Sequence, residues 1–305
     1  MLKKAALSLV VIALLLTGCS KGDQSNNTAT ASPAETISPA ENASPAGSSS
    51  PATSASAAPA SSSSPQAVSY TDLTGVFGQK EITQLAALGV FGDATGAFNA
   101  GKPVSRREFV RWLFKANNSI WASDTNKLVH PAQGEDSNFK DIKTADADFQ
   151  YIQGLQDSGV SVGFPDKTFK PDQTITREQA LAIKDALDRG GVDADYVISK
   201  KDATFGYYSL PDWKDKQTIS PEYVGAIATG YHDDKSSGSD PTRRVDNIPR
   251  AFGAIAMLKP KTALTRGQAA IMLWKIGPHS RAAQDQNART AADALVPGAE
   301  PSASP

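Results

Sequence analysis

The chain has 305 residues, and its 31 Lys and Arg residues nearly balance its 32 Asp and Glu residues, for a formal net charge of −1 at pH 7. This balance excludes the strongly basic field on which nucleic-acid binding and adsorption to anionic lipid surfaces depend. The single cysteine excludes an internal disulfide, so the folded part must be stabilised by its core alone. Recognition by this chain must therefore come from local sites.

The N-terminus has the features of an export signal. Lys3 and Lys4 precede an apolar run over residues 5–16, which is too short to cross a bilayer and is typical of a signal peptide. The run ends in Leu16-Thr17-Gly18-Cys19, which resembles the cleavage box of bacterial lipoproteins. This resemblance implies that residues 1–19 are a lipoprotein signal and that Cys19 is lipidated, placing one end of the chain at the membrane. The alternative is an ordinary secretory signal with a chance cysteine.

Residues 20–68 are predicted to be a disordered linker. Of these 49 residues 36 are Ser, Ala, Pro or Thr, and only Ile37 and Val68 are large and apolar. Such a composition cannot bury a core, so we expect a flexible spacer between the N-terminus and a folded domain.

An eleven-residue pattern then occurs three times with unchanged internal spacing, at residues 98–108, 169–179 and 258–268. We call these the three signature segments. Each segment begins with an apolar residue. Its seventh residue is aliphatic, its eighth is Ser or Thr, its ninth is Arg, and its eleventh and last is Glu or Gln. Repeats of this kind indicate an architecture of similar structural units packed side by side.

Each signature segment predicts the start of a helix. The Ser or Thr is an N-cap and the closing Glu or Gln stands at the third helical position, which predicts three capping boxes. The caps are Ser105, Thr176 and Thr265. Apolar residues at helical spacing upstream, such as Ile82 and Leu85 before Gly89, predict a further helix in each unit.

The first helical residue is the unusual one. Arg106, Arg177 and Arg266 place a cation at the positive end of the helix dipole, at a cost of roughly 0.3–1 kcal/mol each. A residue that is locally unfavourable three times is expected to make a contact outside its own helix. Two interpretations remain open: recognition of an anionic group, or a structural ion pair with Asp72, Asp141 or Asp212.

Residues around the second segment resemble a known repeat. Phe139-Lys140-Asp141, then the turn Gly163-Phe164-Pro165-Asp166, then Thr176-Arg177, resemble the opening, turn and signature of S-layer homology repeats. The resemblance covers about residues 69–278, as repeats at about 70–116, 139–187 and 210–276. It is partial in the third repeat, where Asp212-Trp213 is taken as the opening and an insertion follows. It implies an all-α fold, with three helix-loop-helix units in a pseudo-threefold bundle.

The same resemblance implies what the domain binds. The family typically binds secondary polysaccharides of the bacterial cell wall, often pyruvylated, in grooves between repeats. Carried onto this sequence, the implied ligand-binding residues are Arg106, Arg177, Arg266, Gly92 and Gly163. Both glycines are first of all turn residues. The closing Glu of the family signature is Gln179 and Gln268 in two copies, so one pocket, near Arg177 or Arg106, is a safer expectation than three.

Other chemistry finds little support. Trp112, Trp213 and Trp274 could stack on a sugar, although Trp112 and Trp274 fit a helix core better. No cofactor is expected. No zinc site is expected from three scattered histidines, and the acidic residues from His232 to Asp240 read as a solvated loop rather than a calcium site. No nucleophile signature indicates an enzyme.

The sequence thus predicts a non-enzymatic tether in the cell envelope. Lipid at Cys19 would hold the membrane, and the domain at 69–278 would bind cell-wall polysaccharide. The alternative is a lipid-anchored protein-interaction scaffold whose repeats no longer bind glycan. Residues 279–305 are polar and Ala-rich and are predicted to be a disordered tail.

Overall fold

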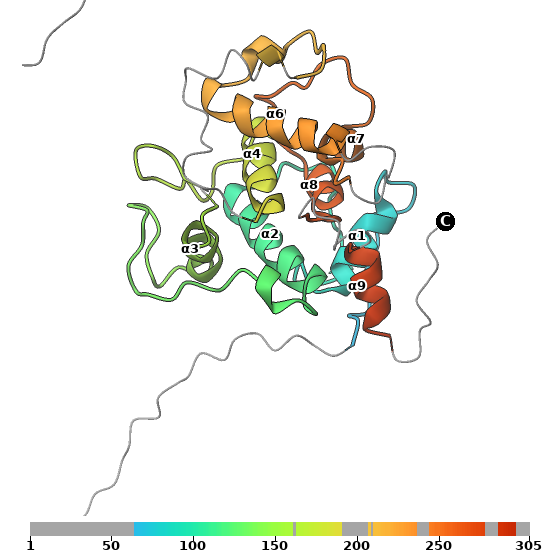
Figure 1. Ribbon diagram of the computed structural model, residues 1–305. Coiled ribbons are helices and arrows are strands. Elements are labelled where there is room, and N and C mark those ends of the chain that lie inside the picture. Colours follow the sequence, from blue (N-terminus) through green and yellow to red (C-terminus); the bar gives the residue numbers. More distant parts are fainter. Residues whose placement is uncertain are drawn as a thin grey trace, which may run out of the picture. The chain divides into compact units, whose positions relative to one another are not determined.

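The computed structural model describes residues 64–160, 163–190, 207–208, 210–236, 244–277 and 286–296, all within one compact unit of the chain. This unit is mostly helical (Figure 1). Its elements are β1 (Ser69–Tyr70), α1 (Gln79–Ala87), β2 (Thr95–Gly96), α2 (Arg106–Ile120), η1 (Thr125–Lys127), α3 (Phe149–Asp157), α4 (Arg177–Asp188), η3 (Lys216–Thr218), α6 (Pro221–Ser236), α7 (Asn247–Phe252), α8 (Arg266–Leu273) and α9 (Ala288–Ala294). The two short strands pair in parallel.

Each signature segment starts a helix at the predicted residue. The hydroxyls of Ser105, Thr176 and Thr265 accept hydrogen bonds from the backbone N–H groups at the third helical position, at 3.3, 3.4 and 3.3 Å. The return bond that completes a capping box is present at α4 and α8. It is missing at α2, where the carboxylate of Glu108 pairs with Arg266 instead. The prediction of three capping boxes was therefore wrong for the first copy.

The residues just before the caps are joined in a closed cycle. The N–H of Val104 donates to the carbonyl of Leu264 at 3.0 Å, that of Leu264 to Ile175 at 2.8 Å, and that of Ile175 back to Val104 at 3.1 Å. All three side chains are fully buried. Because buried backbone groups must be paired, this cycle satisfies three donors and three acceptors at the centre of the fold.

The free N–H groups at the helix starts are satisfied by the neighbouring segment. The first helical residue of α2, α4 or α8 donates its backbone N–H to a carbonyl in another signature segment. These bonds run from Arg106 to Gln173 at 2.9 Å, from Arg177 to Thr262 at 3.0 Å, and from Arg266 to Lys102 at 2.8 Å. Each helix start is thus built by two segments together.

An aspartate anchors the beginning of each signature segment. Asp72 accepts the N–H groups of Phe98 and Asn99 at 2.8 and 2.7 Å, and Asp141 accepts those of Phe169 and Lys170, both at 2.8 Å. The second residue of each pair adopts a left-handed φ, of 59° at Asn99 and 58° at Lys170, which turns both N–H groups toward one carboxylate.

In the third segment this aspartate is Asp215 rather than the expected Asp212. Asp215 accepts the N–H groups of Leu258 and Lys259 at 2.9 and 2.7 Å. The side chain of Asp212 is exposed and pairs only with Lys216 among its described contacts. The opening was misplaced within the sequence: Trp213-Lys214-Asp215 has the same aromatic–Lys–Asp order as Phe139-Lys140-Asp141, so the aspartate of the motif follows the tryptophan rather than preceding it.

Apolar faces of the helices supply the core. Contacts join α2 with α3, α4 with α6, and α8 with both α1 and α7, and Figure 1 shows α4 lying beside α6. The fully buried side chains include Ile82 and Leu85 of α1, Ile152 and Leu155 of α3, and Trp112 of α2. Trp112 packs against Phe91 and Phe98, so this tryptophan is a core residue.

Two parts of the fold differ from the expected boundaries. Helix α9 lies within the predicted disordered tail, capped by Asn287 and packed on α1 and α2, with Ala288 and Ala291 buried. The prediction of disorder is therefore wrong for residues 286–296. At the other end, the backbone N–H of Gln66 donates to Ala87 at 2.8 Å, so ordered contacts begin before residue 69.

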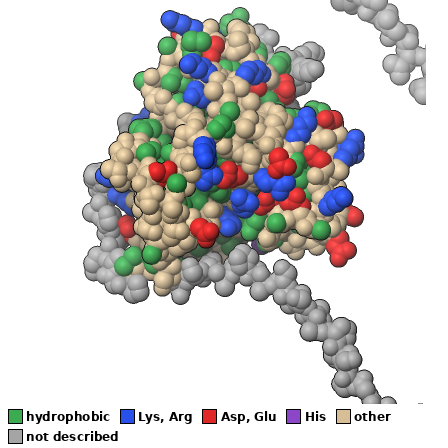
Figure 2. All heavy atoms as spheres, turned by 180° about the vertical axis from the view of Figure 1, so that it is seen from behind, with side chains coloured by type: hydrophobic (Ala, Val, Ile, Leu, Met, Phe, Trp, Pro, Cys, Tyr) green, Lys and Arg blue, Asp and Glu red, His purple; other side chains and the backbone are tan. Residues whose placement is uncertain are grey.

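The remaining N-terminal predictions lie outside the described residues. These are the signal peptide, Cys19 and the linker up to residue 63. The prediction of a solvated loop from residue 232 to 240 is wrong for residues 232–236, because helix α6 continues to Ser236, and the side chains of this stretch lie outside the described residues. Within the described part, none of the helices has the length and apolar character needed to cross a bilayer. Figure 2 shows acidic and basic side chains interspersed on one face, in keeping with the balanced composition.

Candidate functional site

The three predicted arginines make equivalent contacts in a cycle. Each guanidinium donates to the carbonyl of the first residue of another signature segment. The bonds are Arg106 Nε to Phe169, Arg177 Nη1 to Leu258, and Arg266 Nε to Phe98, each at 2.8 Å. The contact outside its own helix that the dipole argument required is therefore a backbone carbonyl.

Each guanidinium also lies over an aromatic ring. Arg106 stands 4.3 Å from the ring centre of Phe164, Arg177 is 4.5 Å from that of Phe252, and Arg266 is 4.7 Å from that of Trp112. Stacking of this kind stabilises a cation that has lost water. The arginines thus make structural contacts with carbonyls and rings, and the ion pairs expected with Asp72, Asp141 or Asp212 are not among their described contacts. Recognition of an anionic group by these arginines stays a prediction.

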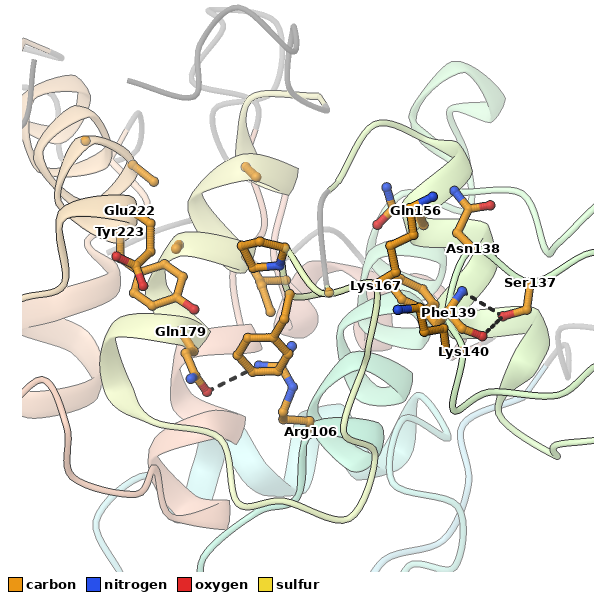
Figure 3. Close-up of a pocket in the computed structure, with 18 of the residues that line it drawn as sticks. Arg106, Ser137, Asn138, Phe139, Lys140, Gln156, Lys167, Gln179, Glu222 and Tyr223 are labelled. Carbon is orange, nitrogen blue, oxygen red and sulfur yellow. Dashed lines mark hydrogen bonds between the residues drawn. The ribbon is translucent and has the colours of Figure 1, made fainter. Parts of the chain in front are cut away.

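Arg106 differs from the other two because it borders a pocket. The pocket has a volume of about 830 Å³ and is open to one side. Helices α4 and α6 border it, and lining residues from the stretches 137–140 and 163–167 stand opposite them. Figure 3 shows Glu222 and Tyr223 on one wall, Asn138, Lys140 and Lys167 on the other, and Arg106 with Gln179 between them. Arg177, Arg266 and Gly92 do not line it.

The charged side chains around the pocket are mostly basic. Arg106, Lys140, Lys167 and Arg189 line it, against the single carboxylate of Glu222. Neutral hydrogen-bonding groups come from Asn138, Gln156 and Gln179, and apolar surface from Phe164 and Tyr223. A concave site with convergent polar groups and one predominant charge suits a ligand that is anionic and rich in hydroxyl groups.

Arg106 is the buried cation of this site. Only 2% of its surface is exposed, and its Nη1 donates to the side-chain oxygen of Gln179 at 3.2 Å. Burial lowers the pKa of Arg106 to about 10, which still leaves it protonated at neutral pH. Burial also raises the pKa of the neighbouring Tyr223, so its hydroxyl remains a neutral hydrogen-bonding group. The site therefore keeps a fixed positive charge.

The two predicted glycines have different reasons for being glycine. Gly92 has a φ of 85° and open space around it, so a left-handed turn explains it. Gly163 lines the pocket, and a Cβ built there would stand 2.2 Å from the ring of Phe139. Its small size is needed for the packing of Phe139 under the pocket wall, a contact that the sequence did not reveal.

The tryptophans considered for sugar stacking lie away from the pocket, and the sequence did not predict Tyr223 as a pocket residue. None of the three tryptophans lines the pocket. Trp112 and Trp213 are buried in the core, and the indole Nε1 of Trp274 donates to Gln84 at 2.6 Å. Tyr223 was missed because α6 lies in the insertion of the third unit. The sequence Ser220-Pro221 does carry a signal for it, since Pro is favoured at a first helical position.

Metal chemistry finds no support in the described part of the chain. No three His, Cys, Asp or Glu side chains among the residues with assigned positions gather closely enough to hold an ion.

Comparison with known proteins identifies a domain within this chain. Residues 138–181 match the S-layer homology domain, so the chain contains a domain of this class. The match includes one wall of the pocket and Gln179, while Tyr223 lies beyond it. The chain is also similar to a cellulosome-anchoring protein of Acetivibrio thermocellus, with 30% identity over 136 residues. That alignment covers 44% of this chain and 28% of the relative, so the chain matches less than a third of the relative's length.

Proposed function

We propose that this chain is a non-catalytic tether of the bacterial cell envelope that binds an acidic secondary polysaccharide of the cell wall. The observation that carries the proposal is the pocket beside Arg106, where four basic side chains and one carboxylate line a cavity of about 830 Å³. Nearly half of the residues that line the cavity belong to the segment that matches the S-layer homology domain. The similarity to an anchoring protein supports the same role.

The binding domain in this proposal consists of three S-layer homology repeats about a pseudo-threefold axis. Its support is the threefold recurrence of one set of contacts: the cap, the anchoring aspartate, the arginine–carbonyl bond and the closed cycle of Val104, Ile175 and Leu264. The third repeat departs most from the pattern, because α6 is longer than α1 or α3. This longer helix supplies Glu222 and Tyr223 to the pocket.

Membrane attachment in this proposal is through lipid at Cys19. Its support is the lone cysteine directly after a short apolar run. One acyl chain gives only marginal membrane binding, so stable anchoring requires more than one. Mass spectrometry of the N-terminal peptide and fractionation of a Cys19→Ser variant test this step. An unmodified thiol on the membrane-bound chain would contradict lipid anchoring and leave glycan binding untouched.

Sedimentation with purified sacculi tests the binding function. The full chain carrying Cys19→Ser, which removes the lipid, is mixed with protein-free sacculi of the producing bacterium before and after removal of their secondary polysaccharide. We expect binding to untreated sacculi and its loss from stripped ones. Equal binding to both would contradict the proposal. Failure to bind either, with retention on wall proteins, would favour the interaction scaffold, which is consistent with two of the three arginines lying away from the pocket.

A further inference from the structure

The third helical position differs among the signature segments in charge, and the structure shows what that difference does. In α2 it is Glu108, whose carboxylate accepts a hydrogen bond from Nη1 of Arg266. In α4 it is Gln179, whose amide oxygen accepts a hydrogen bond from Nη1 of Arg106 at 3.2 Å. The same atom of an equivalent arginine thus meets a carboxylate in one copy and a neutral amide in the other.

The consequence depends on where the two arginines lie. The side chain of Arg266 is 21% exposed, lies outside the pocket and is neutralised locally by Glu108. Arg106 is almost fully buried at the pocket, where charge interactions are less screened than at the surface. Gln179 adds no negative charge beside it. The pocket therefore receives the field of Arg106 together with those of Lys140, Lys167 and Arg189, and the carboxylates that oppose this field are Glu222 on the pocket wall and Asp141, whose charge reaches Arg106.

We infer that Gln179 sets the charge preference of this pocket. With glutamine at this position the site favours a ligand that carries a carboxylate or another anionic group near Arg106, and a glutamate would weaken that preference by opposing the charge of Arg106, with Lys140, Lys167 and Arg189 still lining the pocket. The inference rests on the proposed glycan-binding function and names the residue that determines its selectivity. Because Arg106 is shielded by the ring of Phe164, it acts through its field, and the exposed bonds to the ligand come from other pocket residues.

Gln179 can be changed to glutamate with little risk to the fold. Its side-chain oxygen also accepts the backbone N–H of Thr176 at 3.3 Å as part of the capping box. Glutamate also occurs in capping boxes, and the pair of Glu108 with Arg266 shows that an equivalently placed arginine accepts a carboxylate. Glu108 makes that pair without the return bond to its own cap, so the bond to Thr176 is the contact that Gln179→Glu puts at stake. Gln179→Glu is otherwise a change of one charge at nearly constant shape, in which the hydroxyl of Tyr223, which is hydrogen-bonded to Gln179, would donate to the carboxylate.

The experiment measures binding of the full chain, in its Cys19→Ser form, to three preparations of sacculi. These are untreated sacculi, sacculi whose carboxyl groups have been reduced to alcohols, and sacculi stripped of secondary polysaccharide. The variants are Gln179→Glu, the uncharged Gln179→Met, and Glu108→Gln, which alters charge by one unit at the equivalent position away from the pocket. Thermal melting of each variant verifies that it is folded.

We expect the parent to prefer untreated over carboxyl-reduced sacculi and Gln179→Glu to lower that preference about tenfold. Gln179→Met, which loses the cap bond but adds no charge, should melt lower and keep the preference. Glu108→Gln should bind like the parent. A parent that prefers neither preparation, or a Gln179→Glu variant that keeps the preference, overturns the inference while the polysaccharide-binding function stands. Only undiminished parent binding to stripped sacculi, or no binding at all, contradicts that function itself.

Discussion

Glu108 and Arg266 stand 158 positions apart in the sequence, and their side chains form an ion pair that joins the first signature segment to the last. Glutamate at the third helical position ordinarily returns to its own cap. Here the hydroxyl of Ser105 still accepts the backbone N–H of Glu108, but the carboxylate of Glu108 makes no return bond to the backbone of Ser105. It pairs instead with Arg266 at the start of α8. One residue thus exchanges a local contact for a long-range contact that helps to hold the ends of the domain together.

A double-mutant cycle should measure this long-range contact. Each side chain of the pair is 21% exposed, so screening by solvent is incomplete. We expect Glu108→Ala and Arg266→Ala to couple by about 1 kcal/mol in the free energy of unfolding, and less at high salt. Urea denaturation of the parent, both single variants and the double variant gives the coupling. Additive single effects would show that the pair contributes no net stability.

The contribution of an N-cap to stability can be measured at Thr176, because Thr174 offers a matched threonine two positions away. Thr176→Ala removes the hydroxyl that accepts the N–H of Gln179 and should lower the free energy of unfolding by about 1 kcal/mol. Thr174→Ala is the control: this threonine is exposed and contributes its backbone to the pairing with Ser105. Its effect should stay within about 0.5 kcal/mol. Equal losses in the two variants would contradict the capping role.

Gly163 and Gly92 should respond differently to substitution by alanine. Gly163→Ala places a Cβ against the ring of Phe139, so trimming that ring in a Phe139→Leu background should recover part of the lost stability. Gly92 has a φ of 85° and no atom of the described residues within 4 Å of the position of an added Cβ, so Gly92→Ala strains only the backbone. It should lower the free energy of unfolding by about 1 kcal/mol whether residue 139 is Phe or Leu. Melting temperatures of the four combinations test this. A Phe139→Leu change that rescues both glycines equally would be inconsistent with a specific contact at Gly163.

Asp72 should contribute to loss of stability in acid. The backbone N–H groups of Asn99 and Phe98 hold the pKa of this carboxyl below its ordinary value. A carboxyl whose pKa is lower in the folded state stabilises the fold above its unfolded pKa of about 4, and this contribution is lost as the pH falls through the folded value. Unfolding measured from pH 7 to pH 3 should therefore show a shallower decline in Asp72→Asn than in the parent. Parallel curves would mean that these bonds do not depend on the charge.

The helix starts could be predicted from sequence because each depends on local chemistry. Ser105, Thr176 and Thr265 are caps by residue type and spacing, and the structure agrees at all three. Helix α9 could not be predicted in the same way. Its sequence is short and Ala-rich, and a helix of seven residues is marginal by itself in water. Packing on α1 and α2 stabilises it, and no local pattern reports that packing.

The candidate site was predictable only in part, for a similar reason. Of the five residues expected to bind ligand, Arg106 and Gly163 line the pocket. All three arginines carry the same local signal, and which of them borders a cavity depends on the position of α6, an element of the insertion. Roles for Arg177, Arg266 and Gly92 in binding stay predictions. The partner of each arginine, a carbonyl some sixty or more residues away in sequence, depends on the tertiary arrangement.

The closed cycle of Val104, Leu264 and Ile175 also fixes the copy number of the signature segment. A stack of open-ended repeats can lengthen or shorten by one unit at either end, whereas each segment here donates to one partner and accepts from the other. Deleting one segment would leave a buried donor and a buried acceptor without partners, and a fourth would find no place in the cycle. An increase in the number of signature segments must therefore occur by duplicating the whole set of three. A ring also has no intrinsic first member, so new termini could be opened at a surface connection between segments, giving a circular permutant with the same three joints.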